Sequence, residues 1–179
     1  MELIRPADGE NGLEVRVLGR SMPGVLTLHD YLDAEIVVTS GFAQGHLDVC
    51  LAPDDLDSWS QIPGELAAGR DAVRMDDGRN PGIRFEPSRQ GRFATFAVKD
   101  VAAPGTSVRV PVRPADGWVD EHLERLRRVR AAWPQEVVET SPGACTWRRR
   151  AAGDRRRETS ARAVREDPAS WRTRGRSPA

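Results

Sequence analysis

The sequence predicts an α+β domain: an antiparallel sheet of about six to eight strands built from hairpins, with a short helix and a long C-terminal amphipathic helix packed on one face. Three observations lead to this prediction. Short alternating segments are separated by turn formers, a clear amphipathic helix follows them, and the composition changes at Arg148. We therefore predict one domain over residues 1–147 and a disordered, arginine-rich tail over residues 148–179.

The N-terminal half contains four predicted strands. They are short alternating or β-branched segments at residues 2–5, 13–18, 35–39 and 46–51. In the second segment Leu13, Val15 and Val17 are separated by charged residues, so we expect these three side chains to face the core. Turn formers lie between the segments of each pair, which predicts two hairpins.

A short helix is predicted to begin at Pro53. Asp54 can cap its N-terminus, and the acidic residues that follow favour the positive end of the helix dipole. The dipeptide Pro63-Gly64 is expected to break or kink the helix. This acidic helix is one surface that a protein partner could contact, and the candidate residues are Asp54, Asp55, Asp57 and Trp59.

The C-terminal half continues with strands and ends in a helix. Residues 76–82 are the strongest turn signal of the chain. The strands predicted after it are residues 83–85, 92–99 and 106–113. Pro111 has no N–H to donate, so we expect the last strand at a sheet edge or a bulge. Residues 117–133 then place an apolar stripe that includes His122 along one side of a helix, which Pro134 ends.

No set of residues has the spacing of a catalytic site. His46 and Cys50 lie on one predicted strand about 13 Å apart, whereas a nucleophile and its base need about 3 Å. His122 lies in the apolar stripe, where a hydrogen-bonded core histidine is the better interpretation. Glycine motifs that bind phosphates are absent. We therefore expect a protein that is not an enzyme, with a cryptic site assembled by the fold as the alternative.

The sequence also lacks the patterns that hold a metal ion or a cofactor. Its histidines and cysteines show no zinc-ligand spacing. Asp54, Asp55 and Asp57 form an oxygen-rich run, but the glycine and the glutamate that a calcium loop requires are missing. Helix capping accounts better for these carboxylates, so we expect no metal and no cofactor.

We expect a cytoplasmic protein that does not enter a membrane. A membrane span needs about 20 apolar residues, and no run in the sequence approaches that length. The N-terminus lacks the charged and apolar regions of a secretory signal. Cys50 and Cys145 fit no disulfide framework, which favours a reducing compartment.

The net charge of zero conceals an uneven distribution. Residues 1–117 contain 12 Lys and Arg against 18 Asp and Glu, whereas residues 148–179 contain 11 Arg against 4 acidic residues. Arginines of the tail could bind phosphates while an indole of Trp147 or Trp171 stacks on a base. A solvated extension is the alternative interpretation. The arginines that would carry nucleic-acid binding are Arg148, Arg149, Arg150, Arg155, Arg156 and Arg157.

Several motifs of the predicted domain resemble an uncharacterised family of small actinobacterial (Streptomyces-type) proteins, a domain of unknown function. The motifs are residues 1–5, 23–27, 33–38, 54–59, 118–122, 129–134 and 136–144. The resemblance implies no activity, because none is assigned to that family, and the tail departs from the family's pattern. More distantly, the order of strand, Phe-x-x-Gly turn, strand, Asp-Leu-x-x-Trp helix, hairpins and terminal helix resembles cytoplasmic immunity proteins that neutralise polymorphic toxins.

The sequence thus favours a non-catalytic cytoplasmic module that binds a protein partner and is immunity-like. Its binding surface would be an acidic sheet face or the short acidic helix. Nucleic-acid association through the arginine-rich tail is the alternative function.

Overall fold

The computed structural model describes residues 1–76, 78, 80–87, 94–103 and 105–148. The chain divides after Trp147 into two units, and the fold given below is that of the first unit, Met1–Trp147. None of the helices in these described ranges combines the length and the apolar character that a membrane crossing needs.

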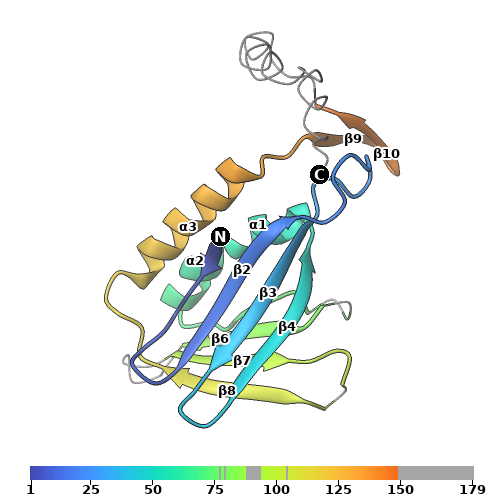
Figure 1. The fold of residues 1–179 in the computed structure, drawn as a ribbon. Helices are drawn as coiled ribbons and strands as arrows, with labels where there is room; N and C mark the ends of the chain where they lie inside the picture. The colour runs from blue at the N-terminus through green and yellow to red at the C-terminus, as the bar shows by residue number, and fades with distance from the viewer. Residues whose placement is uncertain (77, 79, 88–93, 104, 149–179) are drawn as a thin grey trace, which may run out of the picture. The chain divides into compact units, whose positions relative to one another are not determined.

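The alternating segments form two four-stranded antiparallel sheets in which each strand pairs with its neighbour in sequence (Figure 1). The first sheet contains β1 (Glu2–Ile4), β2 (Gly12–Arg20), β3 (Leu32–Thr39) and β4 (Gln44–Leu51). The second sheet contains β5 (Ala72–Arg74), β6 (Gly82–Pro87), β7 (Ala94–Lys99) and β8 (Ser107–Val112). Antiparallel order follows from short connections, which lead each strand back beside the one before it.

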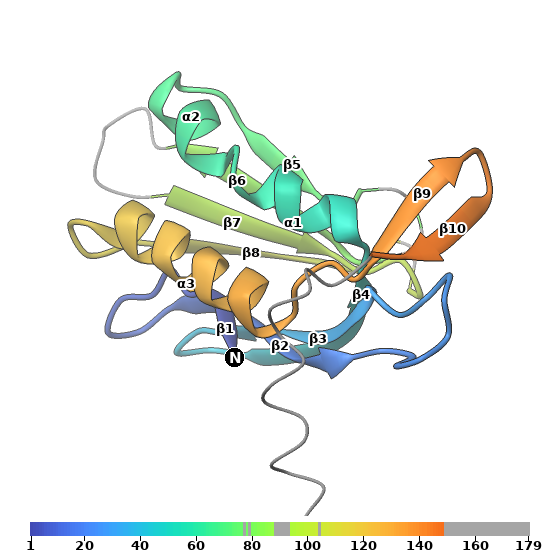
Figure 2. The same cartoon turned by 90° about the horizontal axis from the view of Figure 1, so that it is seen from above.

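In the described part of the unit, three helices and a separate hairpin accompany these sheets. α1 (Pro53–Trp59) and α2 (Ile62–Ala67) connect the two sheets, and α3 (Trp118–Ala132) follows β8. Figures 1 and 2 show the helices next to one another, above the β5–β8 sheet and behind the β1–β4 sheet in the view of Figure 1. β9 (Val137–Ser141) and β10 (Ala144–Trp147) form a two-stranded sheet of their own.

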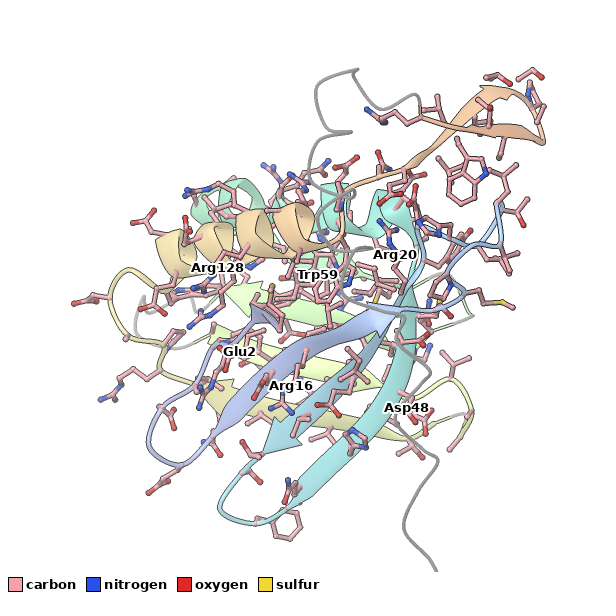
Figure 3. All side chains as sticks on the ribbon, turned by 45° about the horizontal axis from the view of Figure 1, so that its top comes forward. Glu2, Arg16, Arg20, Asp48, Trp59 and Arg128 are labelled. Atoms are coloured by element: carbon pink, nitrogen blue, oxygen red, sulfur yellow. The ribbon has the colours of Figure 1, made fainter. Side chains whose placement is uncertain are left out.

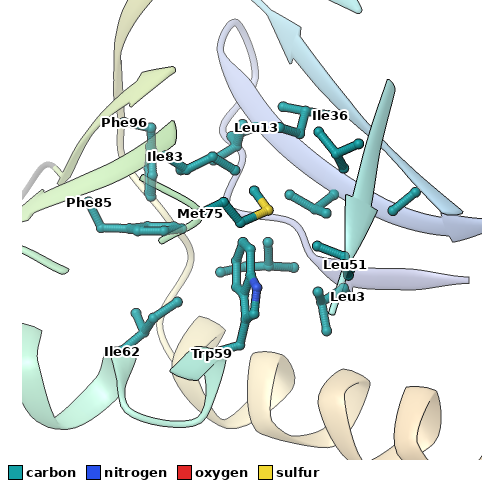
Figure 4. Close-up of a cluster of buried hydrophobic side chains, with 14 of the residues drawn as sticks. Leu3, Leu13, Ile36, Leu51, Trp59, Ile62, Met75, Ile83, Phe85 and Phe96 are labelled. Atoms are coloured by element: carbon teal, nitrogen blue, oxygen red, sulfur yellow. The ribbon is translucent and has the colours of Figure 1, made fainter. Parts of the chain in front are cut away.

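One hydrophobic core fills the space between the sheets and the helices. Leu13, Val15 and Val17 are buried there, which confirms the face predicted for this strand. Trp59 of α1 is fully buried and meets Phe85 of β6 in a T-shaped contact with ring centroids 5.9 Å apart (Figure 4). Since both sheets turn one face to this shared core, the opposite face of each sheet is left for solvent or for partners.

The mixed architecture with antiparallel strands and few helices is confirmed, but the predicted single sheet is wrong. The strands divide into two sheets between β4 and β5. The chain forms α1 and α2 at this point, and a connection that contains two helices does not return the chain as a hairpin. Local alternation predicts a strand and its buried face, whereas membership of a sheet depends on the longer connections.

The last strand and the last helix agree with the sequence pattern. The predicted strand 106–113 is β8, which lies at a sheet edge, where the missing N–H of Pro111 leaves no ladder bond unmade. The helix predicted over residues 117–133 is α3, and it is preceded by Gly117 at a φ of 82°, a conformation that glycine adopts without strain. The predicted strand 92–99 is confirmed from Ala94 onward, and residues 92 and 93 lie outside the described ranges.

Two details predicted for the first helical segment are wrong. Pro63 and Gly64 do not break a helix, because they lie in the first turn of α2, where the N–H that proline lacks has no partner within the helix. Asp54 does not cap α1. Instead, Asp55 Oδ2 accepts a hydrogen bond of 2.7 Å from the backbone N–H of Ala52, the residue before the helix.

Candidate protein-binding face

The outward face of β2, β3 and β4 carries a group of acidic side chains. Strand pairing places Glu35 of β3 between Arg16 of β2 and Asp48 of β4. It also places Glu14 opposite Val37. Opposed residues point to the same side of a sheet, and the alternate residues of these strands are buried in the core. We refer to the outward set as the acidic face, which consists of Glu14, Arg16, Asp33, Glu35, His46 and Asp48.

Glu35 is the centre of the acidic face. Its Oε1 accepts a hydrogen bond from Arg16 Nη1 at 2.6 Å, and its Oε2 lies 2.7 Å from His46 Nε2. Arg16 Nη2 also lies 2.8 Å from Oε1 of Glu14. The hydrogen bond with His46 is the largest effect on the pKa of Glu35 and lowers it. Desolvation opposes this effect, but the charge of Arg16 adds to the lowering, so the pKa lies below its usual value. Glu35 is therefore a carboxylate at neutral pH.

The acidic face keeps an excess of negative charge. Its four carboxylates share one guanidinium, that of Arg16. Asp33 and Asp48 are exposed, and neither has an ion-pair partner among the described residues. Figure 3 shows Arg16 on β2 and Asp48 on β4, and Figures 1 and 2 show the helices on the other side of this sheet. Such a face attracts a cationic surface.

Cys50 is the half-buried thiol at the end of β4, opposite Asp33. Burial raises the pKa of the thiol, and the carboxylates of Asp33 and Asp55 add to this effect against a hydrogen bond with Ser21. The thiolate that a nucleophile requires is thus disfavoured. Within the described ranges, no group of three or more His, Cys, Asp and Glu side chains is placed to hold a metal ion.

The four residues of α1 that were predicted to contact a partner differ in their exposure. Asp54 and Asp57 are exposed, but Asp57 forms an ion pair of 2.7 Å with Arg130 of α3. Asp55 is partly buried at the start of the helix. The prediction for Trp59 is corrected, because its indole is fully buried in the core, where a partner at the surface does not reach it.

The arginines predicted to bind nucleic acid fall almost entirely beyond the part of the chain that the structure describes. Arg148 is the last described residue, and it is exposed. The others, which lie outside the described residues, are Arg149, Arg150, Arg155, Arg156 and Arg157.

Sequence reasoning missed a partly buried polar cluster at the base of β9. The carboxylate of Asp30 accepts hydrogen bonds from the backbone N–H groups of Glu136 and Val137, at 3.0 and 2.8 Å, and pairs with Arg20 at 2.7 Å. Burial acts to raise the pKa of Asp30, but these hydrogen bonds and the charge of Arg20 outweigh it and lower the pKa. Asp30 and Glu136 are 106 positions apart, so no local pattern could have shown that they meet.

Comparisons with known proteins identify a family to which the chain is similar. Residues 1–134 match the sequence model of a family of unknown function, DUF5959. The match ends before β9, so residues 136–144, one of the motifs quoted above, lie beyond it. No curated protein matches the chain. The crystal structure of WHY3 from Arabidopsis thaliana is similar with a TM-score of 0.44 and 10% sequence identity, and the similarity covers 72% of this chain and 86% of that chain. Because the family match includes both four-stranded sheets and α3, the protein belongs to the DUF5959 family of unknown function.

Proposed function

We propose that this protein is a non-catalytic module that binds a protein partner through the acidic face. The observation that carries the proposal is the open face of β2–β4, on which Asp33 and Asp48 are exposed and unneutralised by any described side chain. A surface of this kind steers an oppositely charged partner toward it and fixes its orientation.

The acidic face is already ordered before a partner arrives. The ladder from β2 to β4 fixes the positions of the backbone, and the contacts of Glu35 with Arg16 and His46 fix the central side chains. Binding therefore immobilises few additional groups, which limits its entropic cost. Charge attraction is screened over about 8 Å at physiological ionic strength, so the proposed binding is sensitive to salt.

The partner that fits this face is a protein with a basic surface. The immunity-like order of elements leads us to propose a toxin of an actinobacterial cell as that partner, met in the cytoplasm. α1 is the second candidate surface, through Asp54 and Asp57. The acidic face is preferred because Asp57 is already paired with Arg130.

The test compares two double variants of the full chain. D33K/D48K reverses the unpaired charges of the acidic face, and D54K/D57K makes the same change of net charge on α1. With a labelled lysine-rich peptide as the probe, D33K/D48K should weaken binding by about tenfold or more at low salt. D54K/D57K should leave the affinity within about twofold of the wild type. Fluorescence anisotropy measures both affinities.

Other outcomes contradict the proposal in distinct ways. Equal losses in the two variants would mean that only the net charge of the protein attracts the peptide. A loss confined to D54K/D57K would transfer the binding surface to α1. Absence of salt-sensitive binding by the wild type would remove the proposed function altogether.

Nucleic-acid association through residues 148–179 is retained as the alternative function, because this segment holds 11 arginines against 4 acidic residues. Its test is a chain that ends at Trp147. At low salt the full chain should bind single-stranded DNA with an affinity that falls steeply as salt is added. If the shortened chain binds equally well, the tail does not carry the activity.

A further inference from the structure

Strand pairing gathers three cations on the outward face of the β5–β8 sheet. Arg84 of β6 and Arg109 of β8 both lie opposite Ala97, on the strand between them. Lys99 lies two residues further along β7 and therefore on the same side of the sheet. Directly opposed Cβ atoms are about 5 Å apart and diagonal neighbours about 7–8 Å apart, so these three long side chains can reach one point above Ala97.

The three cations border a hollow of about 260 Å³. Small residues line the space between them, namely Gly82, Ala97, Gly105 and Ser107. Small-molecule sites usually measure about 300–1,000 Å³, so this hollow suits a ligand of the size of a phosphate group with a short or planar substituent. We refer to the hollow with Arg84, Lys99 and Arg109 as the cationic pocket.

Part of the positive charge of the cationic pocket is neutralised by weak ion pairs. Arg109 pairs with Glu86, and Arg84 pairs with Asp71 at 3.1 Å. The arginine side chains are 63% and 48% exposed, and ion pairs this open to solvent contribute little to stability. A ligand with two negative charges can therefore replace the carboxylates. Lys99 is exposed and has no ion-pair partner within the described part of the chain.

We propose that the cationic pocket binds a small phosphomonoester dianion. Lys99 supplies an unpaired ammonium group, and Arg84 and Arg109 supply planar guanidinium groups whose paired N–H donors match phosphate oxygens. The hydroxyl of Ser107 adds a neutral donor. A dianion is favoured over a monoanion because each of the three cations attracts it about twice as strongly. Asp76 and Glu86 also line the hollow and oppose the binding of any anion. This site lies on the other sheet from the acidic face and does not depend on it.

Lys99 is the only lysine of the chain, which makes a selective test possible. Reductive methylation of the full chain with ¹³C-formaldehyde leaves the ammonium charged and gives one lysine resonance in an NMR spectrum. Titration with phenyl phosphate should move this resonance to a saturating value. Phenol, benzoate and sodium chloride, tested at matched concentrations, should not produce a saturating shift. The same titration with inorganic phosphate measures the contribution of the phosphate group alone.

Variants connect the shift to the pocket. K99Q and R84Q should each weaken the binding of phenyl phosphate by about tenfold or more, measured by calorimetry on the unmodified chain. R127Q removes the same charge from a 71% exposed side chain of α3 and should bind as the wild type does. In the NMR titration, the proposal is overturned if the lysine signal does not saturate or if benzoate shifts it equally. It is also overturned if inorganic phosphate binds but phenyl phosphate does not. In calorimetry, it is overturned if K99Q binds phenyl phosphate as R127Q does.

Discussion

His122 is a titratable side chain enclosed by the core. Its Nδ1 lies 3.3 Å from the carbonyl oxygen of Leu3, and its Nε2 lies 3.0 Å from that of Trp59. Burial lowers the pKa of the ring below its ordinary value of 6.5, although both acceptors favour the charged form. The neutral ring carries a single N–H and can donate to one of the two carbonyls at a time. His122 therefore connects α3 to β1 or to α1 without adding a charge to the core.

This placement predicts a dependence of stability on pH. As the pH falls below 6.5, the unfolded chain binds a proton at this ring before the folded protein does. The free energy of unfolding is thus at its full value when the pH is above the pKa of the unfolded chain. Between this pKa and the lower pKa of the folded protein, it decreases by up to about 1.4 kcal/mol for each unit by which the pH falls. H122Q cannot titrate and should remove this decrease. Urea unfolding of both proteins between about pH 7.5 and 5.5 measures the two slopes.

The choice of pH range separates His122 from the carboxylates. Asp8, Asp30 and Glu35 also have lowered pKa values, so their contributions to stability are present above their ordinary values of 3.8 and 4.5 and are lost only as the pH falls through that lower range. Equal slopes for the wild type and H122Q between about pH 7.5 and 5.5 would contradict the assignment to His122.

At the scale of single elements, the β9–β10 hairpin depends on its anchor. A two-stranded hairpin alone is marginally stable in water. Here Asp30 holds the backbone N–H groups of Glu136 and Val137, and Trp147 of β10 meets His29 edge-on with ring centroids 4.7 Å apart. These contacts join the hairpin to the segment between β2 and β3.

Replacing the anchor should release the hairpin and leave the rest of the fold intact. D30A removes the acceptor of two backbone hydrogen bonds, and an unsatisfied pair of this kind costs about 1–3 kcal/mol. Hydrogen exchange should show that the amides of β9 and β10 lose protection by about tenfold or more, whereas those of α3 keep theirs. D33A, which removes an exposed carboxylate without an ion-pair partner, is the control. An equal loss of protection in α3 would show that Asp30 supports the whole domain.

The elements that the sequence predicts correctly are those with a strong local pattern. Leu13, Val15 and Val17 alternate and are buried, and the apolar stripe of residues 117–133 becomes the buried side of α3. The hairpin of residues 137–147 was not predicted, because its side chains are mostly exposed and its anchor, Asp30, is distant in the chain. The division into two sheets likewise depends on contacts between distant segments, which no window of the sequence contains.

The candidate site, too, was predictable only where a local pattern in the sequence indicates it. An acidic sheet face was predicted as a class of surface, but the residues named in advance lay on α1. Leu56 and Trp59 are three positions apart and therefore lie on one side of α1, and the core covers that side. Glu35, Arg16 and His46 could not be grouped from the sequence, since their proximity depends on the register between β2, β3 and β4.

At the scale of the whole unit, the two sheets present opposite charges on opposite sides. Their inward faces share one core, so the acidic face of β2–β4 and the cationic pocket of β5–β8 point away from each other. The connection between β1 and β2 meets the edge strand β8 at one margin, where Asn11 Nδ2 donates to the carbonyl oxygen of Pro111 at 3.0 Å. The two proposed binding surfaces therefore lie on different sheets and do not share a residue.

We predict that the acidic face and the cationic pocket bind their ligands independently of each other. Packed sheets are about 10 Å apart, and the screening length is about 8 Å at physiological salt but about 30 Å at 0.01 M. D33K/D48K should therefore change the affinity of the cationic pocket for phenyl phosphate by less than about 0.5 kcal/mol at physiological salt. At about 0.01 M salt, where the added positive charge is not screened, the same variant should bind the dianion severalfold more tightly. Calorimetry on the wild type, D33K/D48K, K99Q and the triple variant gives the coupling energy. Coupling that persists at physiological salt would mean that the surfaces communicate through the shared core, because screened charges alone cannot produce it.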